Sequence, residues 1–403
     1  MNNQILKTYN RLLRTVPKDT HRFLFSEFNI KSRLTGLIGP RGTGKTTLLL
    51  QFINEKIKDK DECIYASLDN IFFSNILLFD FIEELYEIDG IKYFFLDEVH
   101  KYKNWSQELK NVYDSFPDIK IVFSGSSSMD LVKGAYDLSR RGVLYSLPGL
   151  SFREFIYFKT KQLFKSFDFN ELLACKNECF NDISGFNKLL GYFKEYLEYG
   201  YYPFVFEDKD NYHSKVLNII NKVIYEDIAS FYKLKTDNLH YFKRILSYIS
   251  TIPPGKLNRN NISKHIGLDN KTVHNYLEIL NETGLISLIR ENASGSSVLK
   301  TNEKIFLNNS NIYSVISKDI GSDFSIGTVR EIFFICMARN SGNTINYSKV
   351  GDFCIEGINF EIGGKNKSIK QIKNKLDVSF LVKDNILHRT KYEIPLYLFG
   401  FLY

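Results

Sequence analysis

Short apolar runs without alternating polar residues recur in the first third of the chain, and segments with helical spacing of apolar residues separate them. A brief continuous apolar run is typical of a strand buried on both faces. Strands that alternate with helices predict a parallel sheet with helices on both faces, which is an α/β architecture. The expected strands lie at 33–38, 63–68, 93–96 and 119–123, and the expected helices at 46–57 and 72–85.

The pattern turns predominantly helical after about residue 150. Aromatic residues at helical spacing continue to about residue 239, and helices followed by a β-rich stretch are expected up to residue 308. The tail alternates short strands with one helix near 325–340. A chain of 403 residues suggests two or three domains. The changes in pattern predict three, at residues 1–150, 151–308 and 309–403.

Composition narrows the class of protein. Hydrophobic residues make up 44% and charged residues 25% of the chain, which excludes a disordered polypeptide. No apolar run approaches the ~18–20 residues that a membrane helix needs, and the N-terminal stretch carries charges where a signal peptide has its apolar core. Five cysteines without paired zinc spacing favour a reducing compartment. We therefore expect a cytoplasmic globular protein without a disulfide scaffold.

The formal net charge of +7 is concentrated in two regions. Residues 1–47 contain nine basic and two acidic residues, and residues 361–391 contain eight basic and three acidic residues. Each region is either a solvated surface or a surface that meets phosphate groups.

The most specific motif is a complete GxxxxGK[ST] sequence at residues 39–46, between an expected strand and an expected helix. In this context the glycines let backbone N–H groups converge on a phosphate at the positive end of the helix. Lys45 would reach the β- and γ-phosphates of a nucleotide, and the Thr46 hydroxyl would bind Mg²⁺. The nucleotide-binding residues expected here are Gly39, Pro40, Arg41, Gly42, Thr43, Gly44, Lys45, Thr46 and Thr47.

A second motif closes the expected strand 93–96, which leads directly into Asp97 and Glu98. Asp97 would complete the Mg²⁺ site, and Glu98 would orient the attacking water. Two carboxylates at this place favour a hydrolase over a kinase, because a kinase of this loop class needs a separate acceptor pocket. The two motifs together predict ATP and Mg²⁺ as the bound groups.

Residues after the fourth expected strand are candidates for contact with the γ-phosphate. In an ATPase with an additional strand, a polar residue at the end of that strand reads the γ-phosphate, and Ser124 or Ser126 would take this place. Arg140 or Arg141 could supply a sensor or finger arginine. The structural alternatives are a turn-forming serine cluster and ordinary surface arginines.

The chain resembles the prokaryotic AAA-superfamily ATPases that are related to archaeal-type ATPases. The similarity lies in GLIGPRGTGKTTLLLQ, FFLDEVHKYKNW, FSGSSSMDL and SRRGVLYSLPGLSFREF, and it extends over nearly the whole chain. The resemblance implies a P-loop ATPase domain, then a helical connector with a winged helix, then a small α/β domain of the restriction-endonuclease type. It assigns the phosphate loop to Gly39, Gly44, Lys45 and Thr46, and the two carboxylates to Asp97 and Glu98. Relatives often have Gly-Arg where this chain reads SRRG, so the resemblance leaves open which arginine acts.

Residues 261–284 have helix-turn-helix character with Gly267 at the turn, and the stretch after them favours a β-structured wing. The exposed side of the second helix could contact bases or phosphates of DNA. The alternative is a winged helix used for packing or oligomerisation. The residues expected on this exposed side are Asn270, Lys271, Thr272, His274 and Asn275.

The nuclease fold implied by the resemblance needs a helix glutamate, a strand aspartate and a Glu-x-Lys pair. Glu331, Asp352 and Glu361 suit the carboxylate positions, but Gly363 stands where the lysine is needed. Since alternate residues of a strand share a face, we expect the fold to be kept without active cleavage. The tail predicts instead a basic docking surface for DNA or a partner, made of Lys365, Lys367, Lys370, Lys373 and Lys375.

These observations predict a cytoplasmic ATPase that couples its nucleotide state to a winged-helix and nuclease-like module. The first alternative is a nucleotide-switched regulator that binds DNA or protein with little turnover. The second is an ATP-dependent nuclease. A homo-oligomer or a protein partner is compatible with all three hypotheses.

Overall fold

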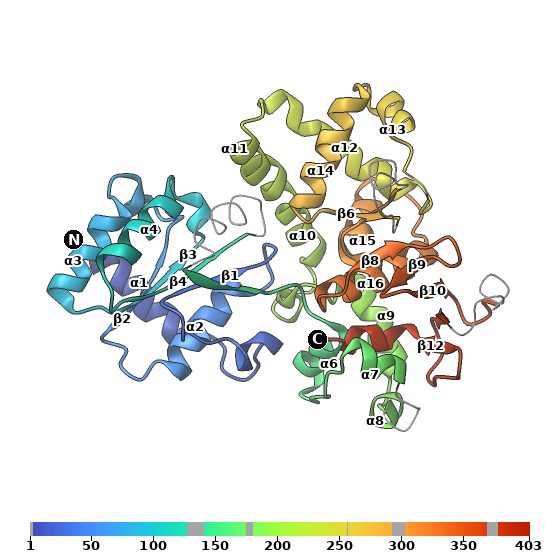
Figure 1. The fold of residues 1–403 in the computed structure, drawn as a ribbon, viewed down its shortest axis with the longest axis horizontal. Helices are drawn as coiled ribbons and strands as arrows, with labels where there is room; N and C mark the ends of the chain where they lie inside the picture. Colours follow the sequence, from blue (N-terminus) through green and yellow to red (C-terminus); the bar gives the residue numbers. More distant parts are fainter. Residues whose placement is uncertain (1–2, 127–140, 175–179, 256, 292–302, 369–377) are drawn as a thin grey trace. The chain divides into compact units, whose positions relative to one another are not determined.

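The computed structural model describes residues 3–126, 141–174, 180–255, 257–291, 303–368 and 378–403. The chain divides into two compact units, Met1–Gly149 and Leu150–Tyr403, and each is described by itself (Figure 1). The first unit ends one residue before the predicted end of the ATPase domain. The further division of the second unit into a winged-helix domain and a tail domain stays a prediction.

The first unit is built on a five-stranded sheet with all strands parallel, in the order β2-β3-β4-β1-β5. Strand β4 therefore lies between β1, which leads into the phosphate loop, and β3, which ends in Asp97. This is the fold of a P-loop NTPase. The strands are β1 (Leu34–Ile38), β2 (Cys63–Ser67), β3 (Tyr93–Asp97), β4 (Lys120–Gly125) and β5 (Gly142–Ser146), and the helices are α1 (Asn3–Thr15), α2 (Lys45–Lys56), α3 (Leu78–Asp89) and α4 (Trp105–Ser115).

Apolar clusters cover both faces of this sheet, as its unbroken apolar strands predict. Along β3, Phe94 and Leu96 join the cluster that contains residues of α3 and α4, whereas Phe95 joins the cluster that contains residues of α2. Successive side chains of a strand point to opposite faces, so α3 and α4 pack on one face and α2 on the other. The sheet is therefore packed on both faces, and its strand ends lie beside these two clusters.

Two features of this unit differ from the sequence prediction. The helix expected at 72–85 begins only at Leu78, because Ile71–Ser74 forms a separate 3₁₀ turn capped by the Asn70 side chain. The pattern did not reveal β5, since Val143 and Leu144 are exposed at 47% and 42% and give no buried apolar run. Strand β5 is recognised only by its parallel pairing with β1.

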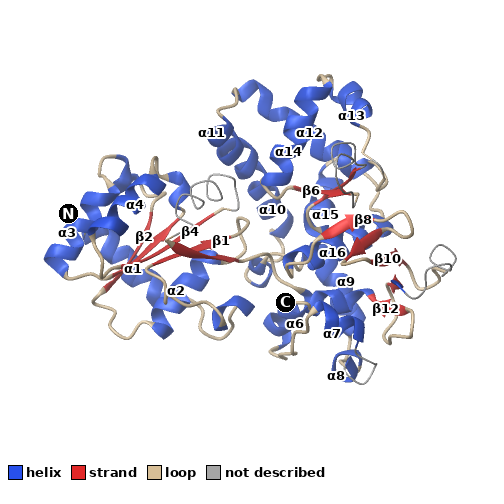
Figure 2. Cartoon of the chain, in the orientation of Figure 1, coloured by secondary structure: helices blue, strands red, loops and turns tan. Residues whose placement is uncertain are grey.

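The second unit begins with a helical part (Figure 2). A π-helix, Val223–Ile228, joins α10 to α11. The α-helices are α6 (Phe152–Thr160), α7 (Phe169–Ala174), α8 (Asn181–Ser184), α9 (Leu189–Tyr199), α10 (Tyr212–Lys222), α11 (Ala229–Tyr232), α12 (Thr236–Thr251), α13 (Arg259–Ile266), α14 (Asn270–Glu282), α15 (Ser310–Asp319) and α16 (Ile326–Asn340).

The strands of the second unit form an antiparallel pair, β6-β7, and a mixed sheet in the order β12-β11-β10-β9-β8. Strands β10, β11 and β12 are parallel to one another, and α16 packs against β10 and β8. Among the described helices, none has the length and apolar character to cross a membrane. The strands are β6 (Ile286–Arg290), β7 (Glu303–Leu307), β8 (Ile345–Tyr347), β9 (Phe353–Ile355), β10 (Ile358–Gly363), β11 (Ser379–Lys383) and β12 (Glu393–Pro395).

Candidate functional site

The phosphate loop connects the end of β1 to the start of α2. Gly39 lies so close to the neighbouring backbone that a Cβ atom there would collide with the Leu147 carbonyl oxygen. Gly42 and Gly44 have φ angles of 78° and 91°, which favour glycine over other residues. The shape of the loop therefore requires glycine at these three positions.

Lys45, the first residue of α2, folds back over the loop. Its ammonium group donates to the carbonyl oxygens of Gly39 (2.9 Å) and Pro40 (3.0 Å), and the residue is buried. The Thr43 hydroxyl also donates to the Pro40 carbonyl, over 2.9 Å. These contacts keep a positive charge and a compact backbone loop at the N-terminus of α2, where anions bind.

The Asp97 carboxylate is the centre of a hydrogen-bond cluster at the carboxyl edge of the sheet. Oδ2 accepts from the Thr46 hydroxyl (2.5 Å) and from the Tyr65 hydroxyl (2.7 Å). Oδ1 accepts from the Ser124 hydroxyl and from the Glu98 N–H (3.1 Å). The structure thus brings together Thr46, Asp97, Glu98 and Ser124, which the sequence placed on three separate segments.

The sequence reasoning missed Tyr65, which lies on β2 and contacts Asp97 from the side opposite Ser124 in the strand order. Burial, and then the neighbouring Asp97 carboxylate, raise the pKa of Tyr65 far above its ordinary value. The raised pKa favours the protonated phenol, which donates the hydrogen bond to Asp97. A single tyrosine within an apolar strand gives no signal of this role.

Glu98 adopts a left-handed backbone conformation, with φ of 54°. A non-glycine residue in this region is strained, and such strain is concentrated at functional sites. Glu98 Oε2 lies 3.4 Å from Nδ1 of His100, whose side chain is only 5% exposed. The carboxylate expected to orient water therefore has a buried imidazole as its neighbour.

The structure does not bring Arg141 to this cluster. Arg141 directly precedes β5, whose first residue, Gly142, pairs with Leu34 at the start of β1, so Arg141 lies at the opposite edge of the sheet from the phosphate loop. There its guanidinium is 3.3 Å from the Asp114 carboxylate. Contact with the γ-phosphate bound by its own chain is excluded by this separation. Arg140 lies outside the described residues.

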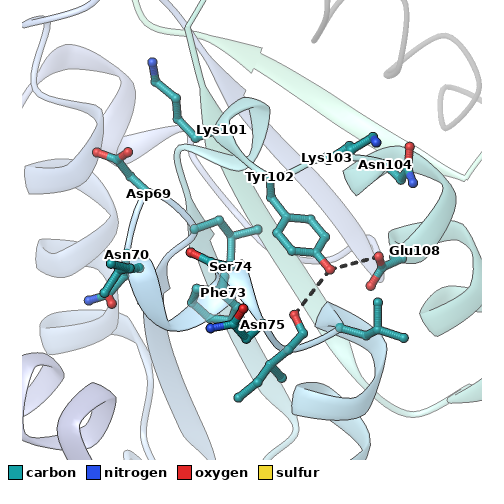
Figure 3. Close-up of a pocket in the computed structure, with 14 residues that line it drawn as sticks. Asp69, Asn70, Phe73, Ser74, Asn75, Lys101, Tyr102, Lys103, Asn104 and Glu108 are labelled. Carbon is teal, nitrogen blue, oxygen red and sulfur yellow. Dashed lines mark hydrogen bonds between the residues drawn. The ribbon is translucent and has the colours of Figure 1, made fainter.

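A cavity of about 630 Å³ lies at the carboxyl ends of β2 and β3 (Figure 3). Its walls are the loops 68–77 and 101–104 together with Glu108. The Tyr102 hydroxyl donates to Glu108 Oε1 over 2.9 Å and accepts from the Leu78 N–H over 3.1 Å, which joins loop 101–104 to α4 and to the start of α3. No residue of the phosphate loop lines this cavity.

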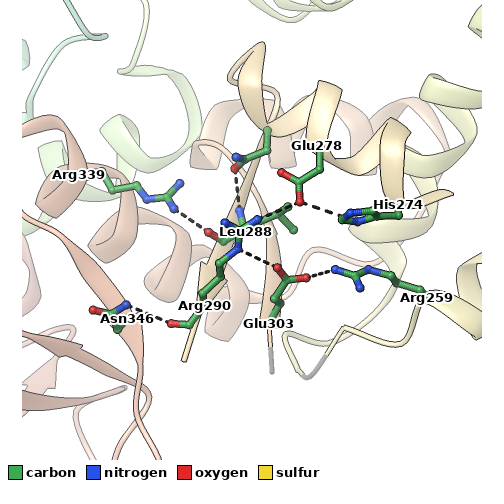
Figure 4. Close-up of polar contacts among 9 residues, drawn as sticks. Arg259, His274, Glu278, Leu288, Arg290, Glu303, Arg339 and Asn346 are labelled. Carbon is green, nitrogen blue, oxygen red and sulfur yellow. Dashed lines mark hydrogen bonds and ion pairs between the residues drawn. The ribbon is translucent and has the colours of Figure 1, made fainter. Parts of the chain in front are cut away.

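The second unit places helices α13 and α14 beside the hairpin β6-β7, and polar contacts hold these elements together (Figure 4). Arg290 of β6 pairs with Glu303 of β7 (2.9 Å) and with Glu278 of α14 (3.0 Å). Arg259 of α13 also pairs with Glu303. The positive charges of Arg259 and Arg290, which could otherwise attract DNA phosphates, are thus paired with carboxylates of the same unit.

Two of the residues expected to face DNA make side-chain hydrogen bonds within the protein. The Asn270 side chain donates to Asn260 (2.6 Å), and the Thr272 hydroxyl donates to Asp269 (2.6 Å), which caps α14. His274 Nδ1 lies 3.9 Å from Glu278 Oε1. Lys271 is exposed and remains the cation of this set that phosphates could reach.

In the tail the structure differs from the expectation that Gly363, and not a lysine, lies beside Glu361. Lys367 reaches back over Gly363, where a Cβ atom would lie 2.5 Å from the lysine side chain, and its ammonium group is 2.5 Å from Glu361 Oε1. The lysine comes from the following loop, so strand alternation does not apply to it. Lys367 is therefore largely withdrawn from the expected basic docking surface. Lys365 is exposed, and Lys370, Lys373 and Lys375 lie outside the described residues.

The three tail carboxylates do not form a metal centre in this structure. Within the described ranges, no group of three or more histidine, cysteine, aspartate or glutamate residues is placed to hold a metal ion. Glu331 on α16 is instead a partly buried acid. Burial, and then the nearby Asp352 carboxylate, raise its pKa from 4.5 to about 8.

We expect Glu331 to make stability depend on pH. Because its folded-state pKa is raised above its unfolded value, stability is full below about pH 4.5 and falls as pH rises towards about 8. The loss is on the order of 2–4 kcal/mol. Urea unfolding should show Glu331→Gln to be more stable than the parent at pH 8 and nearly equal to it at pH 5. The exposed Glu207→Gln is the matched control, and an equal difference at both pH values would contradict the prediction.

Comparison with known proteins gives two family matches. Residues 31–156 match the model of an AAA domain, and residues 190–322 match a domain of unknown function, DUF8612. No curated protein matches the chain.

Solved structures give distant likenesses. PCH-2 from C. elegans is 21% identical over 40% of this chain and 46% of its own, with a TM-score of 0.24. A variant of RuvB from Thermotoga maritima is 14% identical over 81% of this chain and 96% of its own, with a TM-score of 0.31. AMPPCP-bound DnaA from Aquifex aeolicus is 16% identical over 70% of this chain and 88% of its own, with a TM-score of 0.26.

These TM-scores are too low to support an argument, so the assignment depends on the strand order, the phosphate loop and the family match. All three agree on the first unit. Residues 31–156 match the AAA-domain model, and the five-stranded sheet within this range has the fold of a P-loop NTPase.

Proposed function

We propose that the chain binds ATP with Mg²⁺ at the carboxyl edge of the first sheet and hydrolyses it there. The observation that supports this most directly is the cluster in which Thr46, Asp97 and Ser124 meet beside the phosphate loop. Thr46 Oγ1 and Asp97 Oδ2 lie 2.5 Å apart, and such hard oxygen atoms are the ligands that Mg²⁺ prefers. The residues present therefore fit the ion, which would neutralise charge on the phosphates when bound.

Each residue of the cluster has a distinct role in this proposal. Lys45 binds the β- and γ-phosphates, and Thr46 and Asp97 hold the metal ion. Glu98, next to Asp97, orients the water that attacks the γ-phosphate. Ser124, at the end of the strand between β1 and β3, would contact the γ-phosphate, and its hydroxyl donates a hydrogen bond to Asp97.

Substitution of Lys45 and Glu98 separates nucleotide binding from turnover. We expect Lys45→Ala to abolish tight ATP binding, because the loop loses its phosphate-facing cation. We expect Glu98→Gln to keep binding and to lower ATP turnover about 10²–10⁴-fold. Phosphate release and fluorescent nucleotide titration measure the two quantities. Lys56→Ala, at the far end of α2, is the matched control, and turnover that survives both substitutions would reject the site.

Tyr65→Phe tests the hydrogen bond that orients the metal-binding carboxylate. Loss of the hydroxyl leaves Asp97 Oδ2 with one donor fewer and lets the carboxylate rotate. Outer-shell partners of metal ligands typically contribute about 10–100-fold in affinity or activity. We expect the Mg²⁺ concentration for half-maximal turnover to rise about 10-fold, with ATP affinity in the absence of Mg²⁺ unchanged. An unaltered Mg²⁺ dependence would contradict this role.

We also propose that the second unit is the effector of the nucleotide state, as a winged-helix and nuclease-like module without cleavage. The helices α13 and α14 followed by the hairpin β6-β7 support the winged helix, and the mixed sheet with α16 supports the nuclease-like tail. The absence of cleavage is proposed from the sequence, in which Gly363 takes the place of the lysine of a Glu-x-Lys pair, although the fold brings Lys367 to Glu361. A nucleotide-switched regulator with little turnover remains the alternative to a fast ATPase.

DNA binding distinguishes an effector that contacts DNA from one that contacts protein. Binding of a fluorescent duplex should weaken steeply with salt if phosphates are contacted. Because Lys271 is an exposed cation whereas the uncharged Asn270 and Thr272 side chains are hydrogen-bonded within the unit, we expect Lys271→Ala to lower the salt slope by about one and Asn270→Ala to leave it unchanged. An ATP dependence of the affinity would show coupling between nucleotide and DNA. Salt-independent or absent binding would favour a protein partner.

A further inference from the structure

Arg22 is a buried arginine next to the phosphate loop that no motif identifies. It precedes the 3₁₀ turn Phe23–Ser26, and it is only 4% exposed. Its guanidinium donates to three backbone carbonyl oxygens, those of Thr43, Pro148 (2.8 Å) and Gly149 (3.0 Å). The planar fork of a guanidinium can bind several acceptors at fixed angles, which an ammonium group cannot do.

The contact with Thr43 constrains the orientation of the loop. Thr43 is fully buried, and the next residue is Gly44, with φ of 91°. A trans peptide unit is planar, so its C=O and N–H groups point in opposite directions. When Arg22 holds the Thr43 carbonyl on one side of the loop, the Gly44 N–H must face the other side. In a loop of this type, that N–H is one of the groups that cradle the phosphates.

The contacts with Pro148 and Gly149 tie the same loop to the end of the first unit, because Gly149 is the last residue of that unit. The loop also touches this segment directly. The Leu147 N–H donates to the Ile38 carbonyl over 2.8 Å, and the Leu147 carbonyl closes over Gly39. Residues 147–149 therefore contact the end of β1, the first residue of the loop and the arginine that holds Thr43.

We propose that Arg22 is a positioning residue that aligns the phosphate loop for nucleotide and links it to the segment leading into the second unit. The inference rests on the proposed ATP-binding function and adds to it the path by which the loop reaches the rest of the chain. It requires that removal of the guanidinium weaken nucleotide binding by more than its effect on stability explains.

Arg33 offers a matched control at the other end of β1. Its guanidinium also donates to two backbone carbonyl oxygens, those of Tyr113 (2.6 Å) and Phe116 (2.7 Å). It directly precedes β1, whereas the phosphate loop follows that strand. Strand β1 spans Leu34–Ile38, and a strand rises about 3.3 Å per residue. The contacts of Arg33 therefore lie a full strand length away from the phosphate loop.

The first experiment compares Arg22→Met, Arg22→Lys and Arg33→Met by melting temperature without nucleotide and by the Kd for a fluorescent ATP analogue. We expect Arg22→Met to raise the Kd about 10-fold, and Arg33→Met to raise it less than about 2-fold at a similar loss of melting temperature. Arg22→Lys, which keeps the charge without the fork, should lie between the parent and Arg22→Met. An unchanged Kd in both Arg22 variants, or an equal rise in Arg33→Met, would overturn the inference. If Arg22→Met does not fold, Arg22→Lys decides by the same criterion.

The second experiment measures the link to residues 147–149 by amide hydrogen exchange, in a Glu98→Gln background that limits turnover. ATP should slow exchange at the Leu147 and Gly149 amides, and the added Arg22→Lys substitution should remove most of this protection even at saturating ATP. Full protection in the double variant would refute the link. A parent protein that binds no ATP would instead refute the proposed function, so the two failures are distinguishable.

Discussion

The architecture of the first unit depends on the hydrogen bonds of one buried carboxylate. Asp97 is 2% exposed and accepts from Thr46, Tyr65 and Ser124, which belong to α2, β2 and β4. A buried charge is costly unless it is fully hydrogen-bonded. The strands must therefore keep a register that delivers these hydroxyl groups, and that register sets the phosphate loop beside the same carboxylate.

The packing of the sheet makes this arrangement rigid, whereas its loops carry the strained backbone. Apolar clusters pack β3 and its neighbours on both faces, as in a close-packed protein interior. Glu98 and Asn104 both have left-handed φ angles, and they enclose the turn that follows Asp97 and forms one wall of the cavity beside β2 and β3. A short segment with two left-handed residues thus lies between the Asp97 cluster and this cavity.

Several basic side chains of the second unit form ion pairs with carboxylates of the same unit. Arg259 and Arg290 are paired with Glu303, and Lys367 is paired with the buried Glu361. These pairs join neighbouring elements and reduce the positive surface that nucleic acid would meet. Charge counted along the chain is therefore a poor measure of charge available to a partner, because pairing depends on which carboxylates the fold brings near.

The sequence by itself determined the parallel α/β sheet, the phosphate loop and the Asp97-Glu98 pair, since apolar runs and a contiguous motif are local properties of the chain. Only the tertiary structure decided that Tyr65 supports Asp97, that Arg141 lies at the wrong edge of the sheet, and that Lys367 rather than a strand residue meets Glu361. Arg22 belongs to the same class, because its three acceptors come from segments 21 to 127 residues away. Local patterns specify elements, but contacts between distant segments follow from how the elements pack, which no periodicity encodes.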